Sequence, residues 1–205
     1  MAKILLTVPH AACRSEDDKI KHTCDIVAER CARKLFDLLT DKGHRVALRI
    51  AGVNRMEVDY NRPESRGTEW RKNLEKDYAK ADLLIDCHSY PQQFHWPLDL
   101  VILKWLDEHG GDNREFAYGL LSLAIQKDIN GAVAYSQKQN DIVCSSLEAG
   151  LPAVLVEFSE VAVAAKADKV VERFAEAVDE FAKQFEKKKA TSEAKVPELL
   201  DQLFE

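Results

Sequence analysis

The chain alternates short apolar runs with longer stretches in which apolar residues recur at helical spacing. The apolar runs predict strands at residues 3–8, 45–50, 83–86, 98–103, 133–135 and 152–158. The periodic stretches predict helices at residues 23–42, 69–81, 113–127, 142–149 and 166–187. This alternation predicts a single α/β domain in which helices cover both faces of a mostly parallel or mixed sheet.

Two segments lack such periodicity. Residues 54–67 predict a long loop. Residues 188–205 begin with a charged stretch of low hydrophobicity, which is typical of a linker, and Pro197 then opens a last short helix. We therefore expect a domain at residues 1–187, followed by the linker and helix.

Composition excludes several classes of function. A chain of 205 residues with a formal net charge of -6 has room for one sizeable core, but it lacks the clustered Lys and Arg that neutralise phosphates. Its N-terminal apolar run is too short for a signal peptide, and no stretch reaches the ~18 apolar residues of a membrane span. Five cysteines show no zinc-finger spacing. These features predict a cytoplasmic protein that binds neither nucleic acid nor membrane, and they leave its oligomeric state open.

Residues suited to metal chemistry follow three of the predicted strands. His10 follows the first strand, His88 follows the strand at 83–86, and Glu157 ends the strand at 152–158. Ligands of open α/β sheets bind beyond the carboxyl ends of the strands. Catalytic zinc takes about three His or carboxylate ligands and keeps a position for water. The sequence therefore predicts a metal site with His10 and His88 as ligands.

The third ligand has three candidates. Asp25 lies near the start of the helix that follows the His10 loop, and we choose it on position; Glu16 and Cys13 are the alternatives. Asp86 lies two residues before His88, so both side chains point to one face of the strand. Asp86 is thus placed to accept the second ring N–H of His88, or else to cap the following loop.

A run of polar residues within the loop at 54–67 offers a further group of candidates. Arg62 presents a planar fork suited to carboxylates, and Arg66 is close enough in sequence to join it. The alternative is a surface ion pair between Asp59 and Arg62, which contributes little to stability. From this segment alone we favour the ion pair.

Four motifs, taken in order, resemble the N-formylglutamate amidohydrolase family. They are VPHAA, VDYNRP, LLIDCHS and LPAVLVEF. The similarity covers roughly residues 4 to 160, and VDYNR and DCHS are its most specific parts. The family shares its fold, in outline, with the zinc carboxypeptidases and the aspartoacylase-like deacylases. The resemblance therefore implies that fold and one Zn²⁺ per chain.

The resemblance also implies roles for matching residues. His10 and His88 match the two histidine ligands of zinc, and Asp25 resembles the acidic residue that begins the next helix. Asn61 and Arg62 match the pair that, in the deacylases, binds the substrate carboxylate and the scissile carbonyl. These assignments agree with the metal site expected from the strand ends.

Two further positions bear on the chemistry. Glu157 matches the strand-end glutamate that serves as general base. Cys13 stands where the related peptidases and deacylases have glutamate, three residues after the first histidine. The identity of the third ligand therefore stays open between Asp25, Glu16 and Cys13.

Together these features predict a zinc-dependent hydrolase. Its expected substrate is a small N-acyl amino acid, including N-formyl forms, or a short peptide, whose amide bond is cleaved by metal-activated water. Glu157 and Arg62 carry the catalysis, and Asn61 and Arg66 hold a substrate carboxylate. The alternatives are a carboxypeptidase-like or peptidoglycan-directed amidase, and a non-catalytic binding relative.

Overall fold

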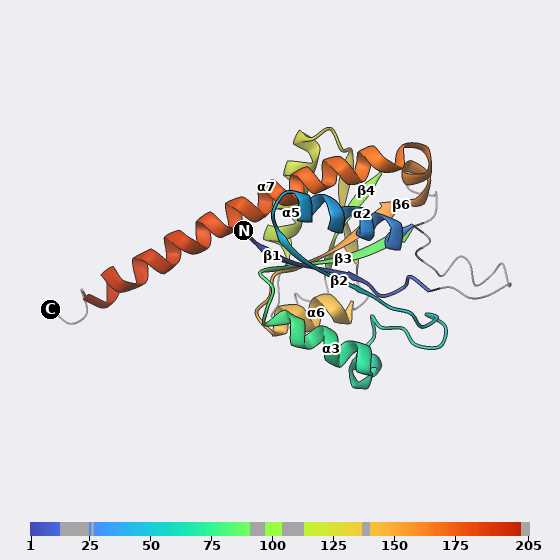
Figure 1. Ribbon diagram of the computed structural model, residues 1–205, viewed down its shortest axis with the longest axis horizontal. Coiled ribbons are helices and arrows are strands. Elements are labelled where there is room, and N and C mark those ends of the chain that lie inside the picture. Colours follow the sequence, from blue (N-terminus) through green and yellow to red (C-terminus); the bar gives the residue numbers. More distant parts are fainter. Residues whose placement is uncertain (13–24, 26, 91–96, 104–112, 137–139, 202–205) are drawn as a thin grey trace.

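The sheet is the centre of the fold. The computed structural model describes residues 1–12, 25, 27–90, 97–103, 113–136 and 140–201 (Figure 1). Within these residues, six strands form one sheet in the order β2-β1-β3-β6-β4-β5. The strands are β1 (Lys3–Val8), β2 (Arg45–Ile50), β3 (Leu83–Tyr90), β4 (Leu98–Leu103), β5 (Gly131–Ser136) and β6 (Ala153–Ser159).

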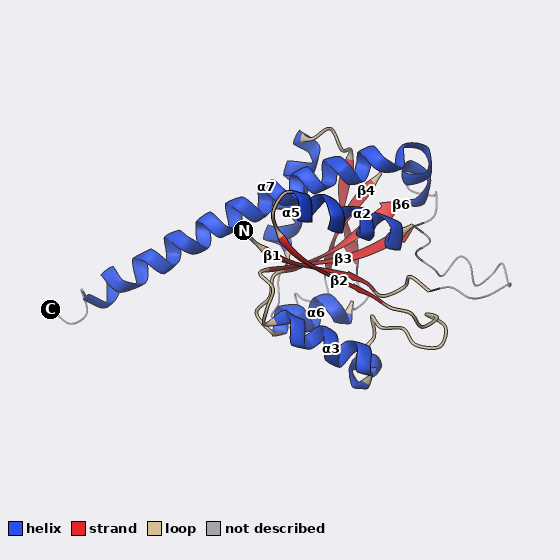
Figure 2. Ribbon diagram, in the orientation of Figure 1, coloured by secondary structure: helices blue, strands red, loops and turns tan. Residues whose placement is uncertain are grey.

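Helices cover both faces of this sheet (Figure 2). They are α2 (Ala28–Asp41), α3 (Glu69–Tyr78), α5 (Arg114–Gln126), α6 (Asp141–Glu148) and α7 (Glu160–Asp201), with a short 3₁₀ helix η1 (Pro63–Gly67). Helices α2, α5 and α7 lie on one face, and α3 and α6 lie on the other. None of the helices in the described part of the chain is both long and apolar enough to cross a membrane.

The sheet is mixed, which confirms the predicted fold class. Strands β2, β1, β3 and β6 run parallel, whereas β4 is antiparallel to β6 and parallel to β5. The carboxyl ends of β1, β3 and β6 therefore meet at one edge. From β1 the chain continues to β2 on one side of β1, and it later forms β3 on the other side of β1. The carboxyl ends of β1 and β3 are therefore the topological switch point, the place at which α/β proteins bind ligands.

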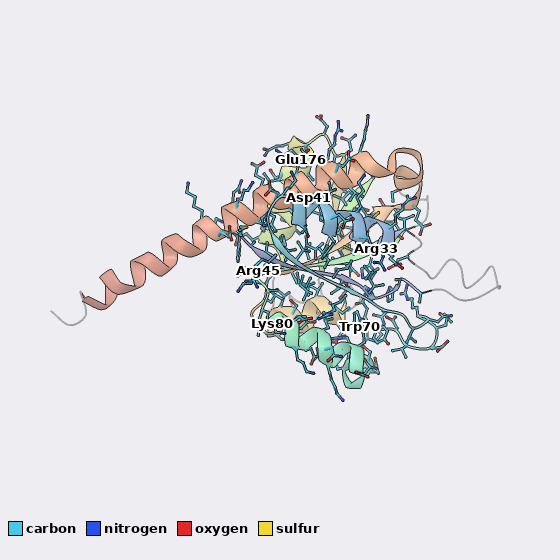
Figure 3. All side chains as sticks on the ribbon, viewed as in Figure 1. Arg33, Asp41, Arg45, Trp70, Lys80 and Glu176 are labelled. Atoms are coloured by element: carbon cyan, nitrogen blue, oxygen red, sulfur yellow. The ribbon has the colours of Figure 1, made fainter. Side chains whose placement is uncertain are left out.

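Apolar side chains fill two cores, one on each face of the sheet. The larger core joins the sheet to α2, α5 and α7 and includes Leu6, Leu35, Ile85, Val156 and Phe174. The smaller core joins it to α3 and α6 and includes Leu74, Leu84, Val143 and Leu155. Exposed faces of the helices instead carry charged residues such as Arg33, Asp41 and Glu176 (Figure 3). Burial of both faces explains why several strands are continuous apolar runs in the sequence.

Several boundaries differ from the prediction. Strand β3 continues through the polar residues to Tyr90, because this extension pairs with β6. Helix α2 begins at Ala28, later than expected, although residues 23, 24 and 26 lie outside the described residues. Helix α7 runs on to Asp201, so the expected linker is helical instead. Residues 187–195 contain no glycine and are mostly strong helix formers, which lets the helix propagate.

Candidate metal centre

Three buried side chains meet at the carboxyl ends of β1 and β3. His10 follows β1, His88 lies within the polar extension of β3, and Asp25 lies just before α2. Their exposed fractions are 2%, 4% and 6%. A potential ligand atom of each lies within 4.8 Å of the other two. The structure thus brings together the residues that the sequence predicts as metal ligands.

The Asp25 carboxylate lies between the two imidazole rings. Its Oδ2 atom is 3.2 Å from Nδ1 of His10 and 2.6 Å from Nδ1 of His88. The ring centroids are 5.0 Å apart in an edge-on arrangement. Both rings therefore turn the same nitrogen, Nδ1, toward a shared carboxylate oxygen.

The outward nitrogen of each ring contacts a second carboxylate. Nε2 of His10 is 2.8 Å from Oδ1 of Asp59, and Nε2 of His88 is 2.8 Å from Oδ2 of Asp86. A metal-binding histidine almost always donates its other ring N–H to a carboxylate, carbonyl or water, which sets its tautomer and orientation. Both histidines have this arrangement.

Asp86 is fully buried and receives hydrogen bonds from several directions. The Thr7 hydroxyl donates to Oδ1, and the Asn140 amide donates to Oδ2 at 2.8 Å. Burial alone would raise the pKa of this carboxyl, but His88 and these donors lower it below its ordinary value. Asp86 is therefore held as a carboxylate beside His88, as the strand geometry predicts.

The charges of the cluster stabilise one another. Burial acts to raise the pKa of Asp25, but the two histidines lower it to about 2. Burial acts to lower the pKa of His88, but Asp86 and Asp25 raise it well above its ordinary value. The carboxylates of Asp25 and Asp86, on opposite sides of the His88 ring, thus stabilise its protonated form.

Glu157 lies beside the cluster at the carboxyl end of β6. It pairs with His88 across the β3–β6 ladder and with Asp99 across the β4–β6 ladder. Burial, opposed by His88 and reinforced by the nearby carboxylates, raises its pKa to about 7. Its Oε2 atom is buried and has no hydrogen-bond partner among the described residues.

The loop after β2 places Asn61 and Arg62 near the cluster. Nδ2 of Asn61 is 2.9 Å from Nε2 of His88, and Asn61 itself is buried. Nε of Arg62 is 3.5 Å from Oδ2 of Asp59, and 39% of the Arg62 side chain is exposed. The Asp59–Arg62 ion pair that the sequence favoured is therefore present, but Asp59 also contacts His10.

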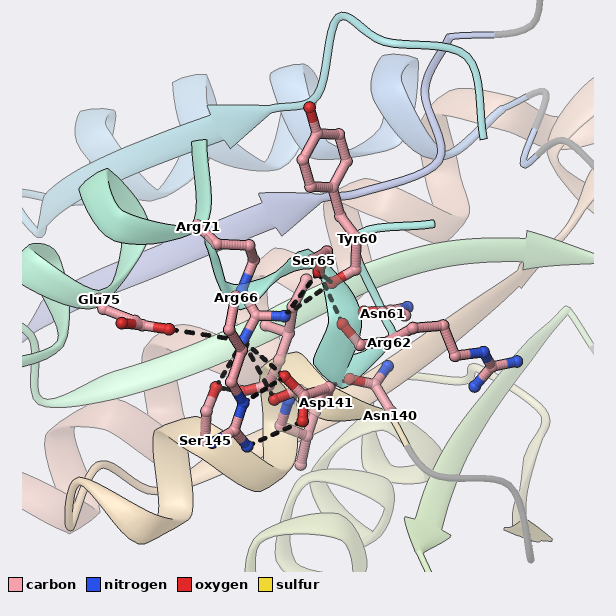
Figure 4. A network of polar contacts seen from close by, with 12 residues as sticks. Tyr60, Asn61, Arg62, Ser65, Arg66, Arg71, Glu75, Asn140, Asp141 and Ser145 are labelled. Atoms are coloured by element: carbon pink, nitrogen blue, oxygen red, sulfur yellow. Dashed lines mark hydrogen bonds and ion pairs between the residues drawn. The ribbon is translucent and has the colours of Figure 1, made fainter. Parts of the chain in front are cut away.

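Arg66 points instead toward α6 (Figure 4). Its Nε and Nη2 atoms donate to the two carboxylate oxygens of Asp141, each at 2.8 Å, and Nη1 donates to Glu148 at 3.2 Å. The guanidinium thus makes a bidentate pair with a fully buried carboxylate. The role of Arg66 in holding a substrate carboxylate stays a prediction.

Two residues that complete the site, Asp59 and Asn140, are not predicted as parts of it. The sequence favours Asp59 as part of a surface ion pair, and nothing in its segment indicates a contact with His10. Asn140 had no assigned role, although it precedes a helix. The two alternatives for the third ligand, Cys13 and Glu16, lie outside the described residues.

Cys87 has a different environment from its neighbour His88. It lies in the larger core on the opposite face of the sheet, as the alternation of side chains along a strand predicts. Burial raises the pKa of its thiol well above the ordinary value. A buried, protonated thiol is a poor nucleophile, so the geometry does not favour cysteine catalysis.

The residues of the cluster fit a zinc ion. Two imidazole nitrogens and one carboxylate oxygen are the donors of many catalytic zinc sites. Three further carboxyl groups, those of Asp59, Asp86 and Glu157, lie around the two imidazoles. The unpartnered Oε2 of Glu157 adds a polar atom beside the cluster. This donor set favours a cation.

Comparison with known proteins supports the fold. No protein-family model matches the chain, and no curated protein does. The solved catalytic domain of CwlV, an N-acetylmuramoyl-L-alanine amidase from Bacillus (Paenibacillus) polymyxa, is 16% identical with a TM-score of 0.55, over 88% of this chain and 98% of that one. The CwlD amidase from Clostridioides difficile, solved with the GerS lipoprotein, is 13% identical with a TM-score of 0.53, over 90% and 98%. The chain has the fold of these amidases.

A third solved structure shares this fold. The gene product Atu2144 from Agrobacterium tumefaciens is 15% identical, with a TM-score of 0.60, over 93% of this chain and 90% of that one. Sequence identities this low show a common architecture and leave the chemistry to be argued from the residues of the site.

Proposed function

We propose that this protein is a zinc-dependent amidohydrolase that cleaves the amide bond of a small N-acyl amino acid or short peptide. One observation carries the proposal. Two histidines direct their Nδ1 atoms to the Asp25 carboxylate, and each directs its Nε2 atom to a further carboxylate, Asp59 or Asp86. His10, Asp25 and His88 would hold the ion. When bound, zinc supplies a Lewis acid that polarises a carbonyl and makes water a nucleophile near neutral pH.

Glu157 is the proton carrier of the proposed reaction. A carboxyl with a pKa of about 7 has the proton affinity that suits a general base near neutral pH. The Glu157 carboxylate accepts a proton from the attacking water while the water oxygen bonds to the amide carbon. It then returns that proton to the leaving nitrogen as the C–N bond breaks.

Arg62 and Asn61 are the proposed substrate-binding residues. The partly exposed guanidinium of Arg62 pairs with Asp59, which in turn contacts His10. From this position it can bind a substrate carboxylate and stabilise a developing oxyanion. The resemblance to N-formylglutamate amidohydrolases favours an acidic N-acyl amino acid as substrate.

A second candidate is a peptidoglycan-directed amidase. The likeness to the CwlV and CwlD amidases supports it, because CwlV is named for an amide bond to L-alanine. That bond also joins an acyl group to an amino acid, so both candidates use the same chemistry. They differ only in the acyl group that the substrate carries.

Metal content tests the proposal. We expect about one zinc per chain in the purified wild-type protein, and loss of that zinc in His10→Ala and His88→Ala. His44→Gln is the matched control, because His44 is buried but pairs with Asp179 away from the cluster. A wild-type protein without zinc, even after zinc is added back, would contradict the proposal.

A substrate screen follows if zinc is present. N-formyl and N-acetyl derivatives of glutamate and aspartate are compared with N-acetylmuramoyl-L-alanine and with short peptides. Preference for the acidic N-acyl amino acids supports the first candidate, and preference for the muramoyl substrate supports the second. A zinc-loaded protein inactive on every substrate would favour a non-catalytic binding relative.

A further inference from the structure

We propose that the start of α6 positions His88, through Asn140 and Asp141. The inference rests on the proposed function in one respect, since it takes His88 as a metal ligand. These two consecutive residues lie far from His88 in sequence, and both are buried. Polar contacts that start from each of them lead to the same atom, Nε2 of His88.

The first route runs through Asp86. Nδ2 of Asn140 donates to Oδ2 of Asp86 at 2.8 Å, and that same oxygen lies 2.8 Å from Nε2 of His88. Thr7 donates to the other oxygen of Asp86. Asn140 and Thr7 thereby hold the carboxylate from both sides. With the carboxylate fixed, the His88 ring is fixed with Nδ1 toward Asp25.

The second route runs through Asn61. The backbone N–H of Asp141 donates to the backbone carbonyl of Asn61 at 3.1 Å. The Asn61 side chain in turn lies 2.9 Å from Nε2 of His88. The first residue of α6 therefore holds the backbone of Asn61 in place.

Two arginines, the buried Arg71 and the partly exposed Arg66, hold this end of α6 in place (Figure 4). Arg71 is fully buried, and its guanidinium donates to the Asp141 carboxylate at 2.9 Å and to the backbone carbonyl of Tyr60 at 2.7 Å. Arg66 makes its bidentate pair with the same carboxylate. The Asp141 carboxylate thus ties α6 to η1, α3 and the loop that carries Asn61.

Asn140 has two functions that can be separated. Its Oδ1 atom accepts the backbone N–H of Val143 at 3.0 Å, which caps α6. Capping needs only an acceptor, and serine or aspartate supplies one equally well. The amide donor, in contrast, is used on Asp86. A residue that caps the helix but lacks this donor therefore isolates the positioning role.

The experiment compares Asn140→Ser with Ser146→Ala. Asn140→Ser keeps a cap and removes the donor to Asp86. Ser146→Ala removes a buried hydrogen bond to the Leu151 carbonyl at the other end of α6 and does not touch the cluster. We expect Asn140→Ser to weaken zinc binding by ~10- to 100-fold in competition with a chelator, and Ser146→Ala to bind zinc as the wild type does. Asn140→Asp, a second variant that keeps the cap, should weaken zinc binding at least as much.

A second measurement needs no metal. Long-range ¹H–¹⁵N spectra of the metal-free protein report the ring nitrogens of His88. These shifts should change in Asn140→Ser and stay at wild-type values in Ser146→Ala. Wild-type zinc affinity in both Asn140 variants, or unchanged His88 shifts, would overturn the inference. A wild-type protein that binds no zinc would instead overturn the proposed function, and the ring shifts would still decide the role of Asn140.

Discussion

Oδ1 of Asp59 lies 2.8 Å from Nε2 of His10, on the side of the ring that faces away from Asp25. The same carboxylate pairs with Arg62 and Arg55 through its Oδ2 atom, at 3.5 and 3.7 Å. Burial acts to raise the pKa of Asp59, but His10, the Asn61 backbone amide and Arg55 lower it. Asp59 therefore connects a charged surface loop to the buried histidine that follows β1.

This contact predicts that Asp59 sets the metal affinity of His10. Asp59→Ala removes the acceptor of the ring N–H, and we expect zinc binding to weaken by ~10- to 100-fold. Asp59→Asn keeps an acceptor without the charge, so its loss should be smaller. Chelator competition measures both. Glu57→Gln, an exposed position in the same loop, is the control, and equal affinity in all three variants would contradict the prediction.

Glu157→Gln should separate catalysis from metal binding. Glutamine has the size of glutamate but cannot accept the proton of the attacking water, so kcat should fall by ~10²- to 10⁴-fold. Zinc content should stay at the wild-type level, because Glu157 is outside the proposed ligand set. Turnover and metal content are measured on the same preparations. Full activity in this variant would remove Glu157 from the role of base.

The pH dependence of activity tests the same residue. Burial raises the pKa of Glu157 to about 7, with His88 opposing this shift and nearby carboxylates adding to it. A base acts when deprotonated, so kcat/KM should rise with pH as Glu157 loses its proton. A bound cation favours the carboxylate, which places the midpoint of this rise at or below pH 7. Activity that falls between pH 5 and pH 7 would contradict the assignment.

The sequence predicts the fold well where burial leaves a simple pattern. Strands β1 and β6 are covered on both faces, so they are apolar runs with clear limits. The extension of β3 to Tyr90 was not predictable in this way. Its polar side chain His88 is paired with other buried groups rather than with solvent, and hydrophobic periodicity carries no information on such partners.

The residues of the site likewise fall into those that the sequence predicts and those that it does not. His10 follows β1 and His88 lies near the carboxyl end of β3, so both could be found from topology, and Asp25 from its place near the next helix. Asp59 and Asn140 could not, because their partners lie 49 and 54 residues away in sequence. A hydrogen bond across that separation depends on how loops pack, which no local pattern records.

The metal-free protein should owe part of its stability to the pair of Asp25 and His88. The pKa of Asp25 is lowered from 3.8 to about 2 in the folded state, and this shift corresponds to about 2 kcal/mol of stability. This contribution to the free energy of unfolding is complete above pH 3.8 and is lost as the pH falls toward 2. The pKa of His88 is raised above 6.5, so its contribution is complete below 6.5 and is lost as pH rises through the raised value.

Thermal unfolding in the presence of a chelator measures this dependence. The difference in Tm between the wild type and His88→Gln should be largest between about pH 4 and 6.5, and should shrink on both sides. Comparing the two proteins at each pH removes the contribution of groups elsewhere in the chain. A constant difference from pH 3 to pH 9 would show that the pair does not titrate as the structure indicates.

Arg62 and Arg66 should respond differently to substitution. Arg62→Ala removes a guanidinium proposed to bind the substrate carboxylate, and a charge-assisted hydrogen bond of ~1.5–3 kcal/mol corresponds to a loss of ~10- to 100-fold in kcat/KM. Its Tm should change little, because its pair with Asp59 is partly exposed. Arg66→Ala breaks a bidentate pair with the buried Asp141 and should lower the free energy of unfolding by about 1 kcal/mol.

Kinetics with an acidic N-acyl amino acid and with its uncharged amide separate these effects. Arg62→Ala should lose activity on the acidic substrate and much less on the amide, since only the former offers a carboxylate. Arg66→Ala should show no such difference, because its guanidinium is engaged by α6 rather than directed at the site. If Arg66→Ala instead discriminates between the two substrates as Arg62→Ala does, Arg66 must exchange Asp141 for the substrate during binding, and the role that the sequence predicts for it would stand.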